Sequence, residues 1–262
     1  MHLPDIQAVA AHVVAAARAE IMPRFLQVQR THKADGSVLT EADLAMQRTL
    51  QAALAADWPE FGFLGEEMDG ATQQAAFVHP LGIWCLDPLD GTGNFASGMP
   101  LFSVSLALLV AGRPVLGVVY DPVRDELYTA VAGGGAFCNG QRLQLIPTGL
   151  QLAQSLAVVD FKRLAMPLRL KVCAESPYRS QRNLGTCALE WCWLAAGRFQ
   201  VYLHGGQNLW DYAAGYLIFA EAGGYAQTLD GVPFTQLPLT PSSVVAAVDA
   251  ELFAAWQAAL RA

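Results

Sequence analysis

Charged side chains are scarce in this sequence. Asp, Glu, Lys and Arg make up 15% of its 262 residues, whereas globular proteins average about 25%. Hydrophobic residues make up 53%, which excludes a disordered chain and predicts a large buried core. The 16 basic residues are outnumbered by 23 acidic ones, for a net charge of −7. A chain without a basic excess is not expected to bind nucleic acid, and an anionic ligand would be repelled unless a cation or backbone amides intervened.

Cysteine pairs and long apolar segments are also missing. No CxxC pair or His-flanked cluster occurs among the five cysteines, which are Cys85, Cys138, Cys173, Cys187 and Cys192. An odd number of dispersed cysteines favours free thiols in a reducing compartment. The longest uncharged apolar stretch, residues 94–112, contains Gly98 and Pro100, unlike a membrane helix of about 20 apolar residues. The N-terminus lacks the basic region of a signal peptide, so we predict a soluble cytoplasmic protein without a membrane segment.

The spacing of apolar residues predicts two halves joined near residue 140, the first covering residues 1–140 and the second 141–262. In the first half, helices are expected at residues 5–27 and 40–56. They precede a meander of antiparallel strands expected at residues 62–64, 83–86, 103–110, 115–120 and 127–131. In the second half, strands are expected at residues 156–159, 169–172 and 201–203, alternating with helices at 186–196, 211–222 and 250–260. This order predicts an α/β (α+β) protein built as a layered sandwich.

Carboxylates inside apolar segments stand out in a chain so poor in charge. Asp87 and Asp90 lie at the end of an expected strand, three residues apart. Gly91, Thr92 and Gly93 follow and expose backbone N–H groups at an expected helix start. Carboxylate oxygens hold Mg²⁺, and amides at a helix start bind phosphate. The simpler alternative is a turn in which Asp caps the helix.

Two other segments carry acids in similar settings. Glu66 and Glu67 follow a short apolar strand, and Asp211 opens an apolar helix. Each of these, taken alone, is more typical of a solvated turn or a helix cap. If Glu66, Asp87, Asp90 and Asp211 shared one cleft, however, four like charges would repel one another strongly. Two or three Mg²⁺ ions would neutralise them and could hold a phosphoryl group beside an activated water.

Three segments resemble the motif regions of the inositol monophosphatase family. They are the Glu pair after Gly65, DPLDGTGNF from Asp87 to Phe95, and WDYAAGYLIFAEAGG from Trp210 to Gly224. The resemblance covers residues 33–234 and implies an αβαβα sandwich. It also implies a Mg²⁺-dependent, lithium-sensitive phosphomonoesterase, commonly a homodimer. The expected reaction is hydrolysis of a small phosphorylated metabolite, similar to inositol monophosphate, by in-line attack of a metal-activated water.

The resemblance also implies roles for individual residues. The expected ligands of two to three Mg²⁺ ions are Glu66, Asp87, Asp90, Asp211 and the carbonyl oxygen of Leu89. The expected catalytic residues are Thr92, which orients the attacking water, its hydrogen-bond partner Asp43, and Glu66 and Asp90. The backbone amides expected to bind phosphate are those of Gly91, Thr92 and Gly93. The residues expected beside the substrate hydroxyls are Asp90, Gly185, Thr186, Cys187, His204 and Asp211.

Several positions depart from the family pattern. Gly93 stands where the family often has a second Thr, and Cys187 where the resemblance would place Ala. Lys33 could approach the phosphate, but we interpret it as a solvated loop residue. His204 lies seven residues before Asp211, where inositol-specific members tend to have a substrate-contacting Glu. A neutral imidazole accepts a hydrogen bond at one nitrogen only, and a protonated one would favour a second phosphate; a surface residue at a strand end is the alternative.

The identity of the substrate therefore stays open at this point. Fructose-1,6-bisphosphate, histidinol phosphate and 3′-phosphoadenosine 5′-phosphate are the alternatives to an inositol monophosphate. A different enzyme class is suggested by residues 91–96, which match a relaxed GxGxxA dinucleotide-binding pattern after a strand. The acid expected about 20 positions later is missing, however, since Arg113 and Pro114 stand there. A regulatory or scaffold protein of the same fold is the non-enzymatic alternative, but the four acids together with Thr92 favour an active enzyme.

Overall fold

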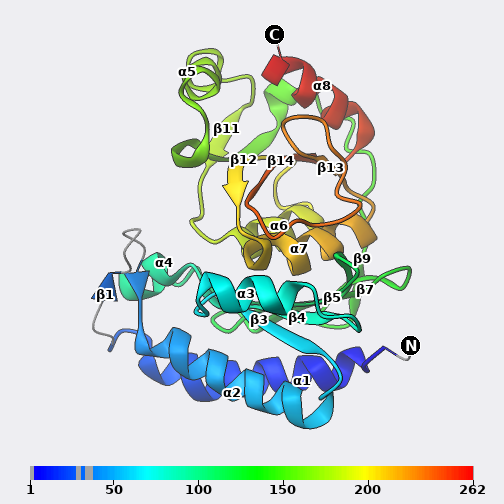
Figure 1. Ribbon diagram of the computed structural model, residues 1–262. Coiled ribbons are helices and arrows are strands. Elements are labelled where there is room, and N and C mark those ends of the chain that lie inside the picture. Colours follow the sequence, from blue (N-terminus) through cyan, green and yellow to red (C-terminus); the bar gives the residue numbers. More distant parts are fainter. Residues whose placement is uncertain (1–2, 28–30, 33–37, 262) are drawn as a thin grey trace.

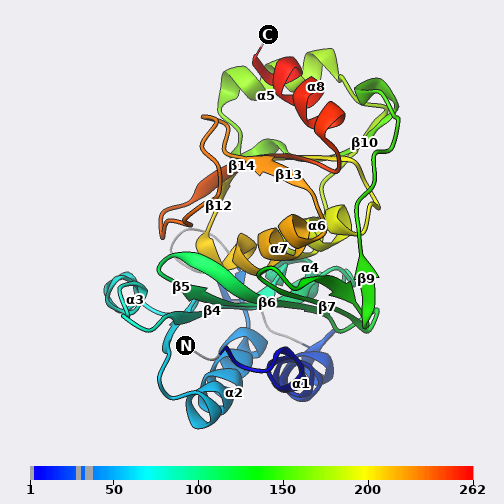
Figure 2. The same cartoon turned by 90° about the vertical axis from the view of Figure 1, so that its right-hand side faces the viewer.

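The computed structural model describes residues 3–27, 31–32 and 38–261, and its elements stack in five layers. Helices form the bottom, middle and top layers, and two sheets lie between them (Figures 1 and 2). From bottom to top the helices are α1 (Ile6–Ala16) and α2 (Glu41–Asp57), α6 (Cys187–Ala195) and α7 (Leu209–Glu221), and α5 (Met166–Glu175) and α8 (Ala250–Arg261). The αβαβα sandwich implied by the sequence is confirmed.

The lower sheet has seven strands in the described part of the chain, in the order β3-β4-β5-β6-β7-β8-β9. They are β3 (Gly62–Gly65), β4 (Ile83–Asp90), β5 (Ser103–Val110), β6 (Arg113–Asp121), β7 (Glu126–Val131), β8 (Gly135–Cys138) and β9 (Gln141–Leu143). Helices α1 and α2 cover one face and α7 covers the other (Figure 1). β4 is buried along its whole length, so the side chains of its last residues lie in the interior of the protein.

The bottom layer follows from helix capping and an apolar stripe. The side chain of Asp5 accepts a hydrogen bond at the start of α1, and Val9, Ala10 and Val13 are buried on its inner face. The helix predicted for residues 5–27 continues as short helical turns, η1 (Ala17–Ile21) and η2 (Met22–Arg24). α2 begins at a capping box formed by Thr40 and Asp43. Between η2 and α2, β1 (Thr31–His32) pairs with β2 (Val38–Leu39).

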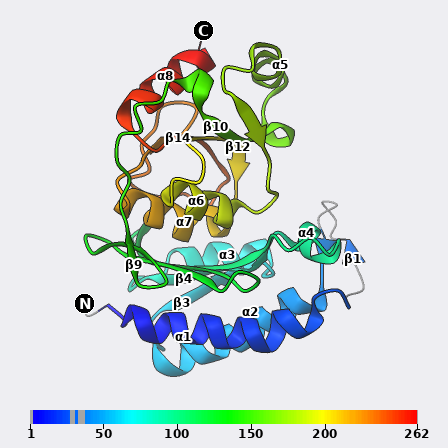
Figure 3. The same ribbon diagram turned by 180° about the vertical axis from the view of Figure 1, so that it is seen from behind.

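The upper sheet has five strands among the described residues, in the order β11-β10-β12-β14-β13. They are β10 (Leu156–Asp160), β11 (Ser180–Arg182), β12 (Val201–Gln207), β13 (Tyr225–Gln227) and β14 (Ser242–Ala247). β10 runs parallel to both β11 and β12. Short helical turns, η3 (Leu152–Gln154) and η4 (Phe161–Arg163), flank β10. β12 runs toward the middle helices (Figure 1), and the chain rises from β9 to the upper sheet along one side (Figure 3).

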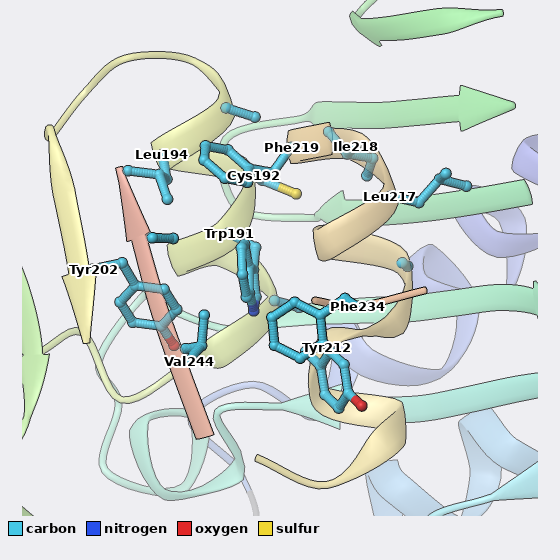
Figure 4. Close-up of a cluster of buried hydrophobic side chains, with 14 of the residues drawn as sticks. Trp191, Cys192, Leu194, Tyr202, Tyr212, Leu217, Ile218, Phe219, Phe234 and Val244 are labelled. Carbon is cyan, nitrogen blue, oxygen red and sulfur yellow. The ribbon is translucent and has the colours of Figure 1, made fainter. Parts of the chain in front are cut away.

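Small residues let the middle helices pack closely on both sides. A Cβ atom added at Gly215 of α7 would come within 2.5 Å of the Cβ of Trp191 in α6. A Cβ added at Gly117 of β6 would lie 3.0 Å from the carbonyl oxygen of Ala214. Trp191 fills the core between these helices and the upper sheet (Figure 4), with its ring centroid 5.3 Å from that of Tyr202. This packing brings the N-termini of α6 and α7 close to the end of β4.

One predicted strand is a helix. Residues 169–172 lie within α5. Leu168, Leu170 and Val172 alternate with basic residues and so imitate a strand, but Pro167 in the first turn favours a helix. Of these residues only Val172 is buried, because α5 lies on the outer surface of the upper sheet.

The predicted meander is wrong for one pair of strands. β3 and β4 are parallel because α3 (Gly70–Phe77), which was not predicted, crosses over between them. The strands β8, β9, β11, β13 and β14 were also missed. Each of these elements has between three and eight residues, too few for a clear hydrophobic period.

The division of the chain at residue 140 stays a prediction. The chain changes sheet between β9 and β10, whereas α6 and α7 of the second half pack against the lower sheet. Within the described ranges, the helices are too short or too polar to cross a bilayer.

Candidate active site

A cavity of about 230 Å³ opens where the middle helices meet the ends of strands from both sheets. Its walls come from the end of β4, the start of α4 (Thr92–Ala96), the N-termini of α6 and α7, and the ends of β10 and β12. The lining residues are Glu66, Asp87, Leu89, Asp90, Gly91, Thr92, Asp160, Arg163, Asn183, Gly185, Thr186, Cys187, Glu190, His204, Gly206, Asn208 and Asp211. Every site residue expected from the sequence is among them except Asp43 and Gly93. Lys33 lies outside the described residues.

β4 supplies two of the four acids through a local irregularity. Side chains of a regular strand alternate between its faces, so residues three apart would point in opposite directions. The register of β4 against β5 shifts between Asp87 and Asp90, and such a shift re-aims the side chains that follow it. Both carboxylates therefore reach the same cavity, where Asp87 is 2% and Asp90 7% exposed.

The other two acids come from a strand end and a helix start. Glu66 follows β3, and its N–H donates to the carbonyl oxygen of Leu86 at 3.0 Å, which keeps it beside β4. Asp211 is the third residue of α7, and its Oδ2 accepts a hydrogen bond from the N–H of Asn208 at 2.8 Å. The helix cap itself is Asn208. Both Glu66 and Asp211 line the cavity.

The acids are unfavourable neighbours when all are ionised. Burial raises the pKa of Asp87 and that of Asp211 well above the usual range, and the carboxylates of Glu66 and Asp90 add to both increases. Burial also raises the pKa of Asp90 to about 6, although a hydrogen bond from Thr186 opposes the increase. A divalent cation would reverse these shifts, because it favours the charged form of every acid around it.

The chemistry of the donor set suits magnesium. Carboxylate and carbonyl oxygens are the ligands that Mg²⁺ prefers, and Leu89 lines the cavity with the acids, its carbonyl oxygen 2.9 Å from the Thr92 hydroxyl. Across the described ranges, no three Asp, Glu, His or Cys side chains are already arranged as a complete ion site. In Asp90, for example, Oδ2 accepts hydrogen bonds from the Thr186 hydroxyl and the N–H of Ala188, and Oδ1 accepts one from the N–H of Cys187. The residues fit the ion by type and location, and their side chains would have to turn toward it.

Thr92 and Asp43 form a hydrogen-bonded pair at the edge of the cavity. The Thr92 hydroxyl lies 3.0 Å from Oδ1 of Asp43 and 2.9 Å from the carbonyl oxygen of Leu89. Oδ2 of Asp43 accepts hydrogen bonds from the N–H and hydroxyl groups of Thr40 at 2.8 and 2.5 Å. Burial raises the pKa of Asp43, although the bonds from Thr40 and Thr92 oppose it. The capping box of α2 thus orients an acid toward Thr92, 49 residues away.

Thr92→Val should lower kcat about a hundredfold with little change in KM, because it removes the hydroxyl but keeps the shape. Thr92→Ser keeps the hydroxyl and should retain kcat within about tenfold. Steady-state phosphate release measures both. Equal rates for the Val and Ser variants would contradict a role for the hydroxyl.

Asp90 joins β4 to the N-terminus of α6. Its oxygens accept hydrogen bonds from the Thr186 hydroxyl at 2.5 Å, the N–H of Cys187 at 3.2 Å and the N–H of Ala188 at 2.7 Å. These N–H groups have no acceptor inside their own helix. The close approach needs a glycine at position 91, where φ is +88° and a Cβ would lie 2.8 Å from the carbonyl oxygen of Leu101.

Sequence reasoning missed six residues of the cavity wall, namely Asp160, Arg163, Asn183, Glu190, Gly206 and Asn208. Two of them could have been found from the sequence, because each is an acid next to or inside an apolar segment. Asp160 ends a predicted strand as Asp90 does, and Glu190 is an acid in an apolar helix. Glu190 is 2% exposed, and burial raises its pKa to about 8. Its Oε1 accepts a hydrogen bond from the N–H of Leu184 at 2.9 Å, which holds the loop before α6.

His204 and Asp160 lie together in the cavity wall. Nε2 of His204 lies 3.2 Å from Oδ2 of Asp160, and Nδ1 accepts a hydrogen bond from the N–H of Gly206 at 3.1 Å. Burial alone would raise the pKa of Asp160. The hydrogen bonds from His204 and from the N–H groups of Lys162 and Arg163 outweigh it, so this pKa is lowered. Direct contact between His204 and a substrate stays a prediction.

The metal-free protein should lose stability as the pH rises from 5 to 8. In the folded state the pKa of Asp90 is about 6 and that of Glu190 about 8, whereas unfolded acids titrate near pH 4. The folded state therefore binds more protons in this interval, and its free energy of unfolding falls with increasing pH. Acids whose pKa is lowered in the folded state, such as Asp249, change the free energy of unfolding only below about pH 4. The melting temperature in EDTA should be higher at pH 5 than at pH 8, and Mg²⁺ should restore it at pH 8. A flat or rising profile in EDTA would contradict this.

The αβαβα fold and the acid-lined cavity between its sheets define a phosphatase. The chain belongs to the inositol monophosphatase family, whose family model matches residues 3–261. It is 38% identical over 212 residues to the inositol-1-monophosphatase of Mesorhizobium japonicum, covering 78% of this chain and 77% of that protein. It is 36% identical over 214 residues to the Nus factor SuhB of Pasteurella multocida, covering 78% and 76%. The solved IMPase of Thermotoga maritima superposes with a TM-score of 0.79 at 26% identity, covering 96% of each chain.

Proposed function

We propose that this phosphatase hydrolyses a small phosphate monoester of the inositol monophosphate type in a Mg²⁺-dependent reaction. The observation that supports this most is the meeting of Glu66, Asp87, Asp90 and Asp211 at one cavity. Two to three Mg²⁺ ions, held by these acids and the carbonyl of Leu89, would supply charge neutralisation and polarise the phosphate and the attacking water. The name of the Mesorhizobium relative supports the substrate class.

In this proposal Thr92 orients the attacking water. Its hydroxyl has one proton and donates it to Oδ1 of Asp43, which leaves the lone pairs of Oγ1 to accept a hydrogen bond from the water. Glu66, on the cavity wall, would accept a second hydrogen bond from that water. In-line attack then depends mainly on position and charge, because the transition state of phosphoryl transfer is loose.

The phosphate and the alcohol are proposed to occupy different walls. Backbone N–H groups of Gly91, Thr92 and Gly93, at the start of α4, would bind phosphate oxygens. The alcohol side would be formed by Asp90, Asp211, Gly185, Thr186, Cys187 and His204. Asp90 thus contributes to both the catalytic and the substrate-facing walls.

A covalent phosphocysteine is not part of the mechanism. Burial, together with Asp211 and Asp90, raises the pKa of the Cys187 thiol well above its usual value. The thiolate is the nucleophilic form of cysteine, and in the metal-free protein this raised pKa keeps Cys187 as the thiol. Water is therefore the proposed nucleophile.

Phosphate release with Mg²⁺ tests the proposal. Inositol 1-phosphate, fructose-1,6-bisphosphate, histidinol phosphate and 3′-phosphoadenosine 5′-phosphate are compared at equal concentration, with and without EDTA. We expect the highest kcat/KM for inositol 1-phosphate and no release in EDTA. A regulatory role is the alternative, supported by the name of the Pasteurella relative; no release from any substrate would favour it.

Three properties stay predictions, the first two drawn from the family and the third from the cysteine pattern and the N-terminal residues. Lithium should inhibit phosphate release, and the chain should form a homodimer, which light scattering measures directly. We also expect a cytoplasmic location.

A further inference from the structure

Asp160 and His204 are neighbours at the ends of two parallel strands. β10 and β12 pair in register with Asp160 opposite His204. Both side chains line the cavity, on the wall formed by the carboxyl ends of the upper sheet. Ligands of parallel sheets characteristically bind at this end of the strands.

His204 has no hydrogen-bonding capacity left for a ligand. Nδ1 accepts from the N–H of Gly206 at 3.1 Å, so this nitrogen carries no proton. The ring proton is therefore assigned to Nε2, which lies 3.2 Å from Oδ2 of Asp160 and 3.7 Å from Sγ of Cys187, two acceptors for that proton. A neutral imidazole offers one donor and one acceptor, and both are used. The His204 side chain is only 4% exposed, against 19% for Asp160.

Asp160 keeps one acceptor position toward the cavity. Its Oδ1 accepts from the N–H groups of Lys162 and Arg163 at 2.8 and 3.3 Å, and its Oδ2 accepts from His204. A carboxylate has about four acceptor positions, so Oδ2 can accept one more hydrogen bond.

Gly205 keeps this carboxylate in place. A Cβ atom at position 205 would come within 1.9 Å of the carbonyl oxygen of Arg163. Only glycine therefore lets the turn after Asp160 lie against β12. The carboxylate is thus held from two sides, by the turn that it caps and by the imidazole.

We propose that Asp160 determines specificity by accepting a hydrogen bond from a substrate hydroxyl, and that His204 is the positioning residue for its carboxylate. This inference rests on the proposed phosphatase function. It places the hydroxyl acceptor at the end of β10, one strand away from position 204, where inositol-specific relatives tend to have Glu. The substrate class is a phosphate ester with a free hydroxyl on this side, because an ionised carboxylate accepts hydrogen bonds and donates none.

Asp160→Asn tests the proposed hydrogen bond to a substrate hydroxyl. The measured quantity is the ratio of kcat/KM for inositol 1-phosphate to kcat/KM for p-nitrophenyl phosphate, an ester that has no free hydroxyl. We expect this ratio to fall at least tenfold, mainly through a higher KM for inositol 1-phosphate. Lys162→Gln is the matched control, because Lys162 is in the same turn but outside the cavity wall, and its ratio should not change. An unchanged ratio in Asp160→Asn, with both esters still hydrolysed by the wild type, would overturn the inference alone. Failure of the wild type to hydrolyse either ester would overturn the proposed function.

Variants of His204 test its positioning role and leave the turn after Asp160 intact. His204→Ala should lower the same ratio, whereas His204→Gln should keep it within about threefold, because Gln can donate to Asp160 and accept from Gly206. In an Asp160→Asn background, His204→Glu returns an acceptor to the wall and should raise the ratio again. Equal ratios in the Ala variant and the wild type would overturn the positioning role.

Discussion

Asp87→Asn should lower kcat more than a thousandfold and raise the melting temperature of the metal-free protein by about 5 °C at pH 8. The loss of turnover corresponds to more than about 4 kcal/mol of transition-state stabilisation. Asp87 is the best buried of the four acids assigned to magnesium. Its removal should also abolish the increase in melting temperature that Mg²⁺ produces in the wild type.

The gain in metal-free stability follows from the surroundings of Asp87. Its carboxylate is 2% exposed, and its one described hydrogen bond comes from the N–H of Leu89 at 3.0 Å. Burial and then the charges of Glu66, Asp90 and Asp211 raise its pKa well above the usual range. Asn keeps the shape and can still accept the bond from Leu89, but it carries no charge to bury.

Asp121→Asn is the matched control. Asp121 is also a buried carboxylate, but Oδ2 pairs with the guanidinium of Arg124 at 2.9 Å and Oδ1 accepts the N–H of Val123 at 2.9 Å. Loss of a paired buried charge is destabilising, so this variant should melt at a lower temperature and remain active. If Asp87→Asn behaved like Asp121→Asn in EDTA, the proposed crowding of acids would be wrong.

Asp90→Asn should also abolish turnover, again by more than about a thousandfold, but with a different effect on structure. Asp90 accepts three hydrogen bonds at the start of α6. The amide nitrogen of Asn cannot accept, so at least one of these donors loses its partner. The fold should be retained, while the backbone amides of Cys187 and Ala188 should exchange with deuterium faster than in the wild type.

Asp69→Ala provides the comparison for the capping effect. Asp69 caps α3, accepting the N–H of Thr72 at 3.0 Å, and lies outside the cavity wall. This variant should keep full turnover. The comparison therefore distinguishes the effect of losing a helix cap from the effect of losing a residue of the active site. An active Asp90→Asn enzyme that still responds to Mg²⁺ would remove Asp90 from the proposed site.

Short segments of the sequence predict much of the site. The buried strand ending in Asp87 and Asp90, followed by two glycines around Thr92, indicates an acid and phosphate site through its local pattern alone. Asp211 and Glu66 are ambiguous in sequence, since a helix cap and a solvated turn account equally well for each. The pairing of Thr92 with Asp43 follows from resemblance to a family and not from any local pattern.

Other features of the site depend on residues that are distant in sequence. Asp90 contacts Ala188 across 98 positions, and Asp160 meets His204 because β10 and β12 are neighbours in the upper sheet. No period or motif marks such contacts. The environment of α5 is likewise invisible in its own residues, so their alternation predicts a strand although Pro167 favours a helix.

The amino-acid sequence by itself determined the layered α/β class and the three motif segments with the acids they contain, because the pattern of each segment is local. Only the tertiary structure decided which carboxylates share a cavity and which distant donors form hydrogen bonds to them. The physical reason is that the environment of a charge is set by the packing of distant segments, and this environment governs both its pKa and its capacity to bind.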